Sequence, residues 1–152
     1  MEKKLFLPEF LFYNKVMMVV CETLIDVQFF DIDPMNVVWH GNYVKYLETA
    51  RCDLLNKIGY NYDDMKADGV AYPIAKMDLK FIKPAFFMQK LKVVSTLVEL
   101  EPSLNIKYEI FDVKTGEKIF TAKSMQICVD IKTLESIYKA PNRFVESVKN
   151  YA

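Results

Sequence analysis

The residues best suited to chemistry lie close together, just before the strongest helical pattern in the chain. Asp31 and Asp33 follow an apolar run, and His40, the only histidine, comes seven residues after Asp33. A helical pattern begins near Tyr43. Because a helix N-terminus carries partial positive charge, a carboxylate placed before it is suited to attack a carbonyl, and the helix start is suited to hold the resulting oxyanion.

Each of these side chains also has a purely structural explanation. An Asp-x-Asp-Pro sequence before a helix is commonly a turn with capping carboxylates, and we assign Asp31 to the turn or to orienting Asp33. A lone histidine near a helix start can cap the helix or bond within the core, so for His40 this role stays open beside a catalytic one. The residue types mark a candidate site and leave its roles to be decided.

Composition and charge limit the classes of function that the chain can have. With 152 residues, 52% of them hydrophobic, it is long enough for one domain with a substantial core. The formal net charge is zero without blocks of like charge, which argues against binding nucleic acid. Three widely spaced cysteines and one histidine predict reduced thiols in a cytoplasmic protein and no metal site. We expect no membrane span.

The hydrophobic pattern of the first half predicts a strand followed by one long helix. The strand is expected within residues 17–30, where the Asp-Pro sequence ends it. The helix is expected at 43–58, with Asn42 as its N-cap and Gly59 as a left-handed residue after its end. Its wide apolar surface predicts that it is enclosed on more than one side. Residues 61–69 are polar and predict a loop.

The second half of the chain predicts four strands in a meander. A short C-terminal helix is then expected to start at Pro141. One helix against a largely antiparallel five-stranded sheet is an α+β architecture. The four strands are expected at residues 77–82, 91–100, 104–110 and 118–130, with Pro84 ending the first and a hairpin turn at 112–117.

These elements and motifs together resemble the hotdog-fold acyl-CoA thioesterases of the 4-hydroxybenzoyl-CoA thioesterase family, and most of all the Tol-Pal-associated branch. The resemblance implies a five-stranded sheet wrapped around the long helix over residues 17–152, preceded by an N-terminal arm at 1–16. Asn36 stands where the family often has glycine, and asparagine tolerates left-handed backbone better than most residues. The matching segments are Asp31 to Met35, Val37 to Tyr43, Glu48-x-x-Arg51 and Leu79 to Ala85.

The resemblance implies a role for individual residues in thioester hydrolysis. Asp33 would attack the thioester carbonyl as a nucleophile or activate water as a general base, and both alternatives remain open. The backbone N–H groups of His40 and Gly41 would hold the oxyanion, and the His40 ring would bond the thioester or orient water. Another hotdog branch uses a helix glutamate, which makes Glu48 a reserve catalytic candidate. An ion pair between Glu48 and Arg51 is the simpler expectation.

The resemblance also implies an assembly. Hotdog proteins pair edge to edge, so we expect a homodimer and, from two of these, a homotetramer. Tyr72, Pro73 and Ile74 would then approach the partner's Asp33 and complete the substrate pocket across the dimer interface.

The substrate implied is an acyl-CoA, with CoA entering as part of the substrate and no cofactor required. Its phosphates would need surface cations, and Lys80, Lys83, Lys90 and Arg143 are available. Two alternatives remain. One is a thioesterase acting on an acyl-carrier protein, and the other is a non-catalytic hotdog module that binds an acyl chain or a protein.

Overall fold

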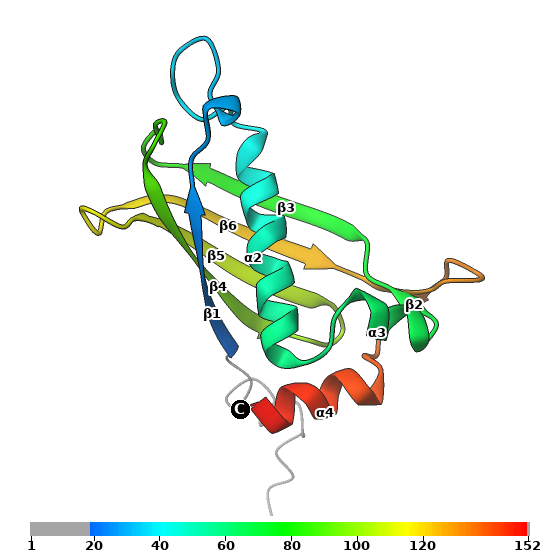
Figure 1. Cartoon of the computed structure of the whole chain (residues 1–152). Helices are drawn as coiled ribbons and strands as arrows, with labels where there is room; N and C mark the ends of the chain where they lie inside the picture. The colour runs from blue at the N-terminus through cyan, green and yellow to red at the C-terminus, as the bar shows by residue number, and fades with distance from the viewer. Residues whose placement is uncertain (1–18, 152) are drawn as a thin grey trace, which may run out of the picture.

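The computed structural model of the chain describes residues 19–151, and the expected N-terminal arm at 1–16 lies outside them. The chain forms a curved sheet with one long helix against its inner face (Figure 1). In chain order the elements are β1 (Val19–Asp26), a 3-10 turn (Phe29–Asp31), α2 (Asn42–Ile58), α3 (Tyr62–Ala67), β2 (Val70–Ala71), β3 (Ile74–Phe81), β4 (Lys90–Glu99), β5 (Leu104–Asp112), β6 (Lys118–Gln126), β7 (Cys128–Asp130), β8 (Ser136–Ile137) and α4 (Asn142–Tyr151).

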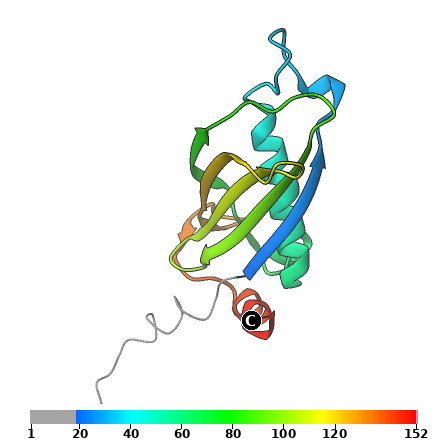
Figure 2. The ribbon, with the colours of Figure 1, turned by 90° about the vertical axis from the view of Figure 1, so that its left-hand side faces the viewer.

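The five long strands form one antiparallel sheet in the order β1-β4-β5-β6-β3, and this sheet wraps around α2 (Figure 2). The α+β architecture predicted from the sequence, with five strands around one central helix, is confirmed. The meander is wrong in one place, because β3 pairs with β6 at the far edge and not with β4. Residues 82–89 carry the chain from that edge to the other side of the sheet, and strand periodicity cannot reveal such a crossing.

The core lies between α2 and the inner face of the sheet. Tyr43 stacks on Phe120 of β6 at 4.8 Å between ring centroids and meets Phe81 of β3 edge-on at 5.3 Å. Leu47 and Leu54 of the helix are fully buried, and each such side chain contributes about 1.5–3 kcal/mol to folding. The helix contacts β1, β4 and α4, so it is enclosed on more than one side, as predicted.

The predicted C-terminal end of α2 agrees with the structure, and the predicted N-cap does not. Gly59 has a φ of +85° and ends the helix as expected. The N-cap residue is Gly41, so the prediction of Asn42 as the cap is wrong. The Asn42 side chain is buried and instead donates to the backbone carbonyl of Asp31 at 2.7 Å. This hydrogen bond directs the side chain away from the N–H groups of its own helix.

The chain after α2 is also more ordered than predicted. Part of the expected loop at 61–69 is helix α3, which begins with a capping box: the Asn61 side chain accepts from the N–H of Tyr62, and Asp64 accepts from the N–H of Asn61. The expected strand at 118–130 is divided into β6 and β7, and β7 belongs to a small second sheet with β2 and β8. The polar composition of residues 61–69 indicated a loop where a helix forms, and residues 118–130 contain no glycine or proline that would mark the division of the strand.

Candidate active site

Asp31 is a buried carboxylate that ties the loop before α2 to the helix. Its side chain is 7% exposed, and Oδ2 accepts hydrogen bonds from the Tyr46 hydroxyl at 2.8 Å and from the Gln28 N–H at 2.9 Å. Burial, and then the bond to Asp31, raises the pKa of Tyr46, so the phenol stays a neutral donor. This is the turn role predicted for Asp31.

Asp33 lies two residues further along in a tight loop and is half-buried. Its Oδ1 accepts from the Met35 N–H at 2.8 Å, and its own N–H donates to the Val37 carbonyl at 2.9 Å. Asn36 closes the loop at a φ of +61°, which confirms that asparagine supports the left-handed turn. Oδ2 of Asp33 has no hydrogen-bond partner among residues 19–151. This oxygen is therefore free to act on a substrate.

Two backbone N–H groups are unbonded where α2 begins. Those of His40 and Gly41 have no acceptor in the described part of the chain, whereas the next, of Asn42, donates to the Trp39 carbonyl at 2.9 Å. The Trp39 ring covers Gly41 so closely that a Cβ at position 41 would lie 2.2 Å from it. Glycine is therefore required unless Trp39 moves. Free N–H groups at a helix N-terminus are the usual components of an oxyanion hole.

A hollow of about 220 Å³ opens beside these groups. The His40 ring borders it and leans on Trp39 at 5.0 Å between ring centroids. The Val38 N–H donates to the Ala85 carbonyl at 2.9 Å, so the two sequence motifs meet here. Asp33 is in the adjoining loop and does not line the hollow. The lining residues are Val38, His40, Tyr43, Phe81, Ile82, Lys83 and Pro84.

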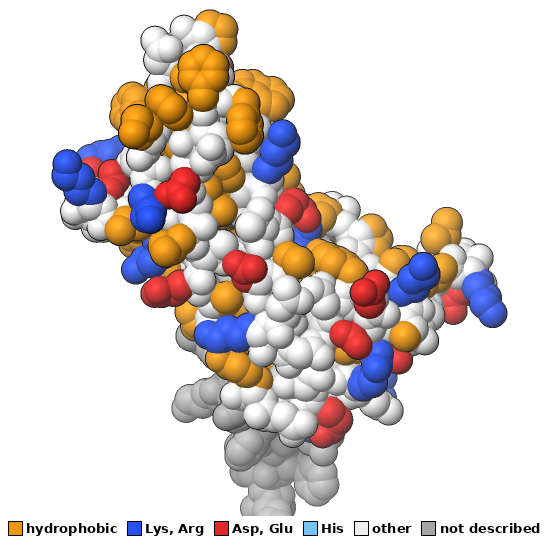
Figure 3. Space-filling model, viewed as in Figure 1, with side chains coloured by type: hydrophobic (Ala, Val, Ile, Leu, Met, Phe, Trp, Pro, Cys, Tyr) orange, Lys and Arg blue, Asp and Glu red, His pale blue; other side chains and the backbone are white. Residues whose placement is uncertain are grey.

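Exposed apolar side chains surround this end of the molecule, as Figure 3 shows. They come from two loops, at 28–39 and 82–89, which an edge-on contact joins at 5.9 Å between the Phe29 and Phe87 rings. Such a rim suits contact with an acyl chain or with a second copy of the chain. The exposed side chains are Phe29, Phe30, Met35, Trp39, Ile82, Phe86, Phe87 and Met88.

Glu48, the reserve candidate, forms the predicted ion pair with Arg51. Arg51 is buried, and its Nε also donates to the Tyr62 hydroxyl at 3.0 Å. Truncating one partner of such a pair would leave the other charge poorly compensated. The ion pair accounts for Glu48 without a catalytic role.

Tyr72, Pro73 and Ile74 lie at the opposite end of β3 from the hollow. The strand runs from Ile74 to Phe81, a separation of roughly 23 Å along its length. Tyr72 is buried edge-on against Phe144 of α4 at 5.8 Å. Within one chain these residues do not reach the hollow, and a second copy would be needed to bring them to it.

Two residues contribute to the site without having been given a role from the sequence. Tyr46 holds the Asp31 carboxylate, and Trp39 packs over Gly41. For Tyr46 a signal was available. It lies four residues after Asn42, so both side chains share one helix face, and both reach Asp31. The contact of Trp39 has no comparable sequence signal.

The fold and this site define a class of protein. The family model described as the thioesterase-like superfamily matches residues 27–149, and the chain belongs to that superfamily. Its sheet and central helix are those of the hotdog fold. The chain is therefore a thioester hydrolase.

Individual relatives agree with this class. YneP of Bacillus subtilis (strain 168), to which acyl-CoA thioesterase activity is ascribed, is 30% identical over 115 residues, which cover 74% of this chain and 82% of YneP. The acyl-acyl carrier protein thioesterase ATL3 of Arabidopsis thaliana chloroplasts is 27% identical over 113 residues, or 73% of this chain and 59% of ATL3. The structure of a DHNA-CoA thioesterase from Staphylococcus aureus has a TM-score of 0.78 and 29% identity, covering 86% of this chain and 89% of that one.

Two kinds of feature are absent from the described residues. Among the helices of residues 19–151, none has the length and apolar character to span a membrane. The same residues hold no cluster of three or more histidine, cysteine or acidic side chains that could bind a metal ion.

Proposed function

We propose that this chain hydrolyses acyl-CoA thioesters, with Asp33 as the reacting carboxylate and the N–H groups of His40 and Gly41 as the oxyanion hole. The observation that carries the proposal is the pair of unbonded N–H groups beside the hollow. The thioester oxygen would point at these groups, where developing negative charge is stabilised most. The relatives that act on acyl-CoA support the choice of substrate.

The free Oδ2 of Asp33 fits two routes. As a nucleophile, it would bond to the thioester carbon while CoA leaves as a thiolate, and water would then hydrolyse the mixed anhydride. As a general base, it would take a proton from a water molecule whose oxygen attacks the same carbon. Both routes end in a carboxylic acid and free CoA, and the unbonded oxygen supports both.

A second copy of the chain would complete the site. β3 is an edge strand of eight residues, seven of them exposed. It presents Leu79 and Phe81 to solvent, although Phe81 contacts Tyr43 of α2 and Leu79, two residues before it, lies on the same face of the strand. An uncovered edge with apolar side chains favours pairing with another strand. Antiparallel pairing of β3 with its copy would bring the partner's Ile74 to the Phe81 end, beside the hollow. We therefore propose a homodimer that further pairs into a dimer of dimers.

The test is release of free thiol from acyl-CoAs with short, medium, long and aromatic acyl groups. Asp33→Asn is expected to lower kcat by about a hundredfold or more, because the amide can neither attack nor accept a proton well. Asp63→Asn, the same change at an exposed position of α3, is the matched control and should retain full activity.

Three results would contradict parts of the proposal. Full activity of Asp33→Asn would remove Asp33 from the mechanism. Faster turnover of the same acyl group on an acyl-carrier protein would change the substrate. Saturable binding without turnover on either carrier would make the chain a binding module.

A further inference from the structure

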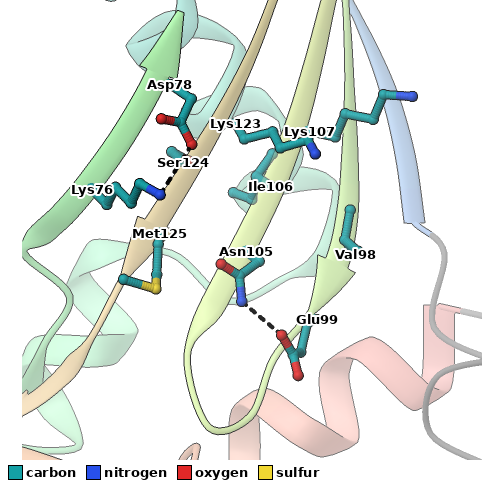
Figure 4. A pocket seen from close by; sticks show the side chains of 10 residues that line it. All are labelled: Lys76, Asp78, Val98, Glu99, Asn105, Ile106, Lys107, Lys123, Ser124 and Met125. Carbon is teal, nitrogen blue, oxygen red and sulfur yellow. Dashed lines mark hydrogen bonds and ion pairs between the residues drawn. The ribbon is translucent and has the colours of Figure 1, made fainter.

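The face of the sheet that points away from α2 has a hollow that thioester hydrolysis does not use. Its volume is about 430 Å³, and it extends over β3, β4, β5 and β6 (Figure 4). Three lysines line it: Lys76 from β3, Lys107 from β5 and Lys123 from β6. This local excess of lysines needs an explanation, because the net charge of the whole chain is zero.

The sheet register places two of these lysines directly opposite each other. Lys107 of β5 pairs with Lys123 of β6, and both are exposed, while the next pair along, Tyr108 and Ala122, is buried in the core. In Figure 4 the Lys123 side chain runs across β5 toward Lys107. Like charges opposite each other on one face destabilise a sheet. This pair is therefore costly unless an anion binds between or beside the two ammonium groups.

The carboxylate nearest to Lys123 is already engaged. Asp78 lies opposite Lys123 in the register of β3 and β6. Its Oδ2 lies 3.5 Å from the Lys76 ammonium nitrogen, and this pair is drawn in Figure 4. Lys123 has no ion pair with any residue between 19 and 151. One of the two opposed ammonium groups is therefore uncompensated by the protein.

The carboxylate nearest to Lys107 is shared. Glu109 lies 3.8 Å from the Lys107 nitrogen and 2.5 Å from the Lys118 nitrogen, each measured to a carboxylate oxygen. The shorter contact to Lys118 is the stronger one. The two lysines lower the pKa of Glu109, the hydrogen bond from Lys118 being the largest cause. Glu109 thus forms ion pairs with two lysines, so it compensates the charge of Lys107 only in part.

A neighbouring hollow of about 320 Å³ extends this basic surface. It shares Lys107 and Lys123 with the first and adds Lys80 and Lys118. Lys80 also has no ion pair in the described chain. The other cations considered for CoA phosphates are occupied: Lys83 pairs with Glu117, Lys90 with Asp26, and Arg143 with Asp64 and Asp68. Together the two hollows hold five lysines and three carboxylates.

We infer that this outer face binds a phosphorylated nucleotide at the pair Lys107 and Lys123. Two lysines at directly opposed strand positions, with Lys123 reaching toward Lys107, suit a ligand with more than one phosphate. Val98 of β4 and Met125 of β6 border the hollow on either side of β5 and add apolar surface for a flat base (Figure 4). Two sources share this chemistry: a free nucleotide, and the nucleotide end of CoA. The second source rests on the proposed function, whereas nucleotide binding itself does not.

The test is calorimetric titration of the full chain with adenosine 3′,5′-bisphosphate, with adenosine as the uncharged comparison. Saturable binding that weakens as salt is added is expected from the wild type. The double variant Lys107→Gln/Lys123→Gln should bind about tenfold or more weakly. Lys66→Gln/Lys139→Gln removes the same charge from exposed positions elsewhere and should bind like the wild type.

Stability and kinetics separate the remaining explanations. If the opposed lysines exist for a ligand, the Lys107→Gln/Lys123→Gln variant unfolds at the same or a higher temperature than the wild type. A lower unfolding temperature, equal affinity of the two double variants, or adenosine binding as tightly as the bisphosphate would overturn the inference. Two results together identify the nucleotide end of CoA as the source. Adenosine 3′,5′-bisphosphate then inhibits hydrolysis of an acyl-CoA competitively, and Lys107→Gln/Lys123→Gln raises the KM for that acyl-CoA without changing kcat. Binding without competition identifies a free nucleotide.

Discussion

Asp31 and Asp33 stand two residues apart, yet their surroundings are opposite in character. The carboxylate of Asp31 is buried and bonded by the Tyr46 hydroxyl and the Gln28 N–H, whereas Asp33 keeps one oxygen free. A buried carboxylate that accepts two hydrogen bonds at one oxygen holds the loop in place, and a partly exposed one is available to a substrate. The division of roles follows from burial and not from residue type.

Removing the Tyr46 hydroxyl tests the structural half of this division. Tyr46→Phe keeps the ring but leaves the Asp31 carboxylate without its side-chain donor, which should lower the free energy of unfolding by about 1–3 kcal/mol. Urea denaturation measures this. Tyr138→Phe, at an exposed position, should change stability by less than about 0.5 kcal/mol. Equal stability of the two variants would mean that the Tyr46 bond to Asp31 does not hold the loop.

At the scale of elements, the start of α2 is shaped by a residue outside the helix. The Trp39 ring lies over Gly41, and the chain must pass beneath it before the helix begins. The two unbonded N–H groups, at His40 and Gly41, belong to this stretch of backbone. Their direction therefore depends on Gly41 having no side chain.

Gly41→Ala should displace this backbone, because the new Cβ meets the Trp39 ring at 2.2 Å. Misplacing one oxyanion donor is expected to lower kcat by about a hundredfold. Steady-state thiol release measures the effect. The double variant Gly41→Ala/Trp39→Ala removes the collision and should recover part of the lost activity. Unchanged kcat in Gly41→Ala would exclude this backbone from the oxyanion hole.

At the scale of the whole molecule, β3 is an edge strand with one side unpaired among the described residues. The strand is bonded to β6 on one side and to nothing within residues 19–151 on the other. The hollow at His40 lies at one end of this edge, and Tyr72 to Ile74 lie at the other. The two-fold dimer that we propose along β3 would join these ends.

Leu79→Lys should separate the dimer, since it places a charge on the strand where the two copies would meet. Sedimentation velocity is expected to show a monomer, with loss of thioesterase activity. Val113→Lys, in the exposed hairpin turn between β5 and β6, is the matched control and should leave both the dimer and the activity intact. A dimer that persists in Leu79→Lys would contradict pairing through β3, as would a fully active wild-type monomer.

Features that depend on neighbours within about one helical turn were predictable from the sequence. The length of α2, its end at Gly59, the left-handed Asn36 and the ion pair of Glu48 with Arg51 are all of this kind. Each follows from side-chain spacing or from the φ angles that a residue tolerates. The resemblance of two local motifs then extended this information to the fold and the class of enzyme.

The tertiary structure decided what depends on contact between distant segments. It placed β3 at the sheet edge, turned Asn42 toward Asp31 and not toward its own helix, and set Lys107 opposite Lys123. Strand order and register follow from how the whole core packs, and alternation along one strand carries no information about its neighbour. The sequence by itself determined most of the local elements, α3 excepted, and the candidate residues. Only the tertiary structure decided which of those residues are in contact, because contacts between distant segments depend on how all the elements pack together.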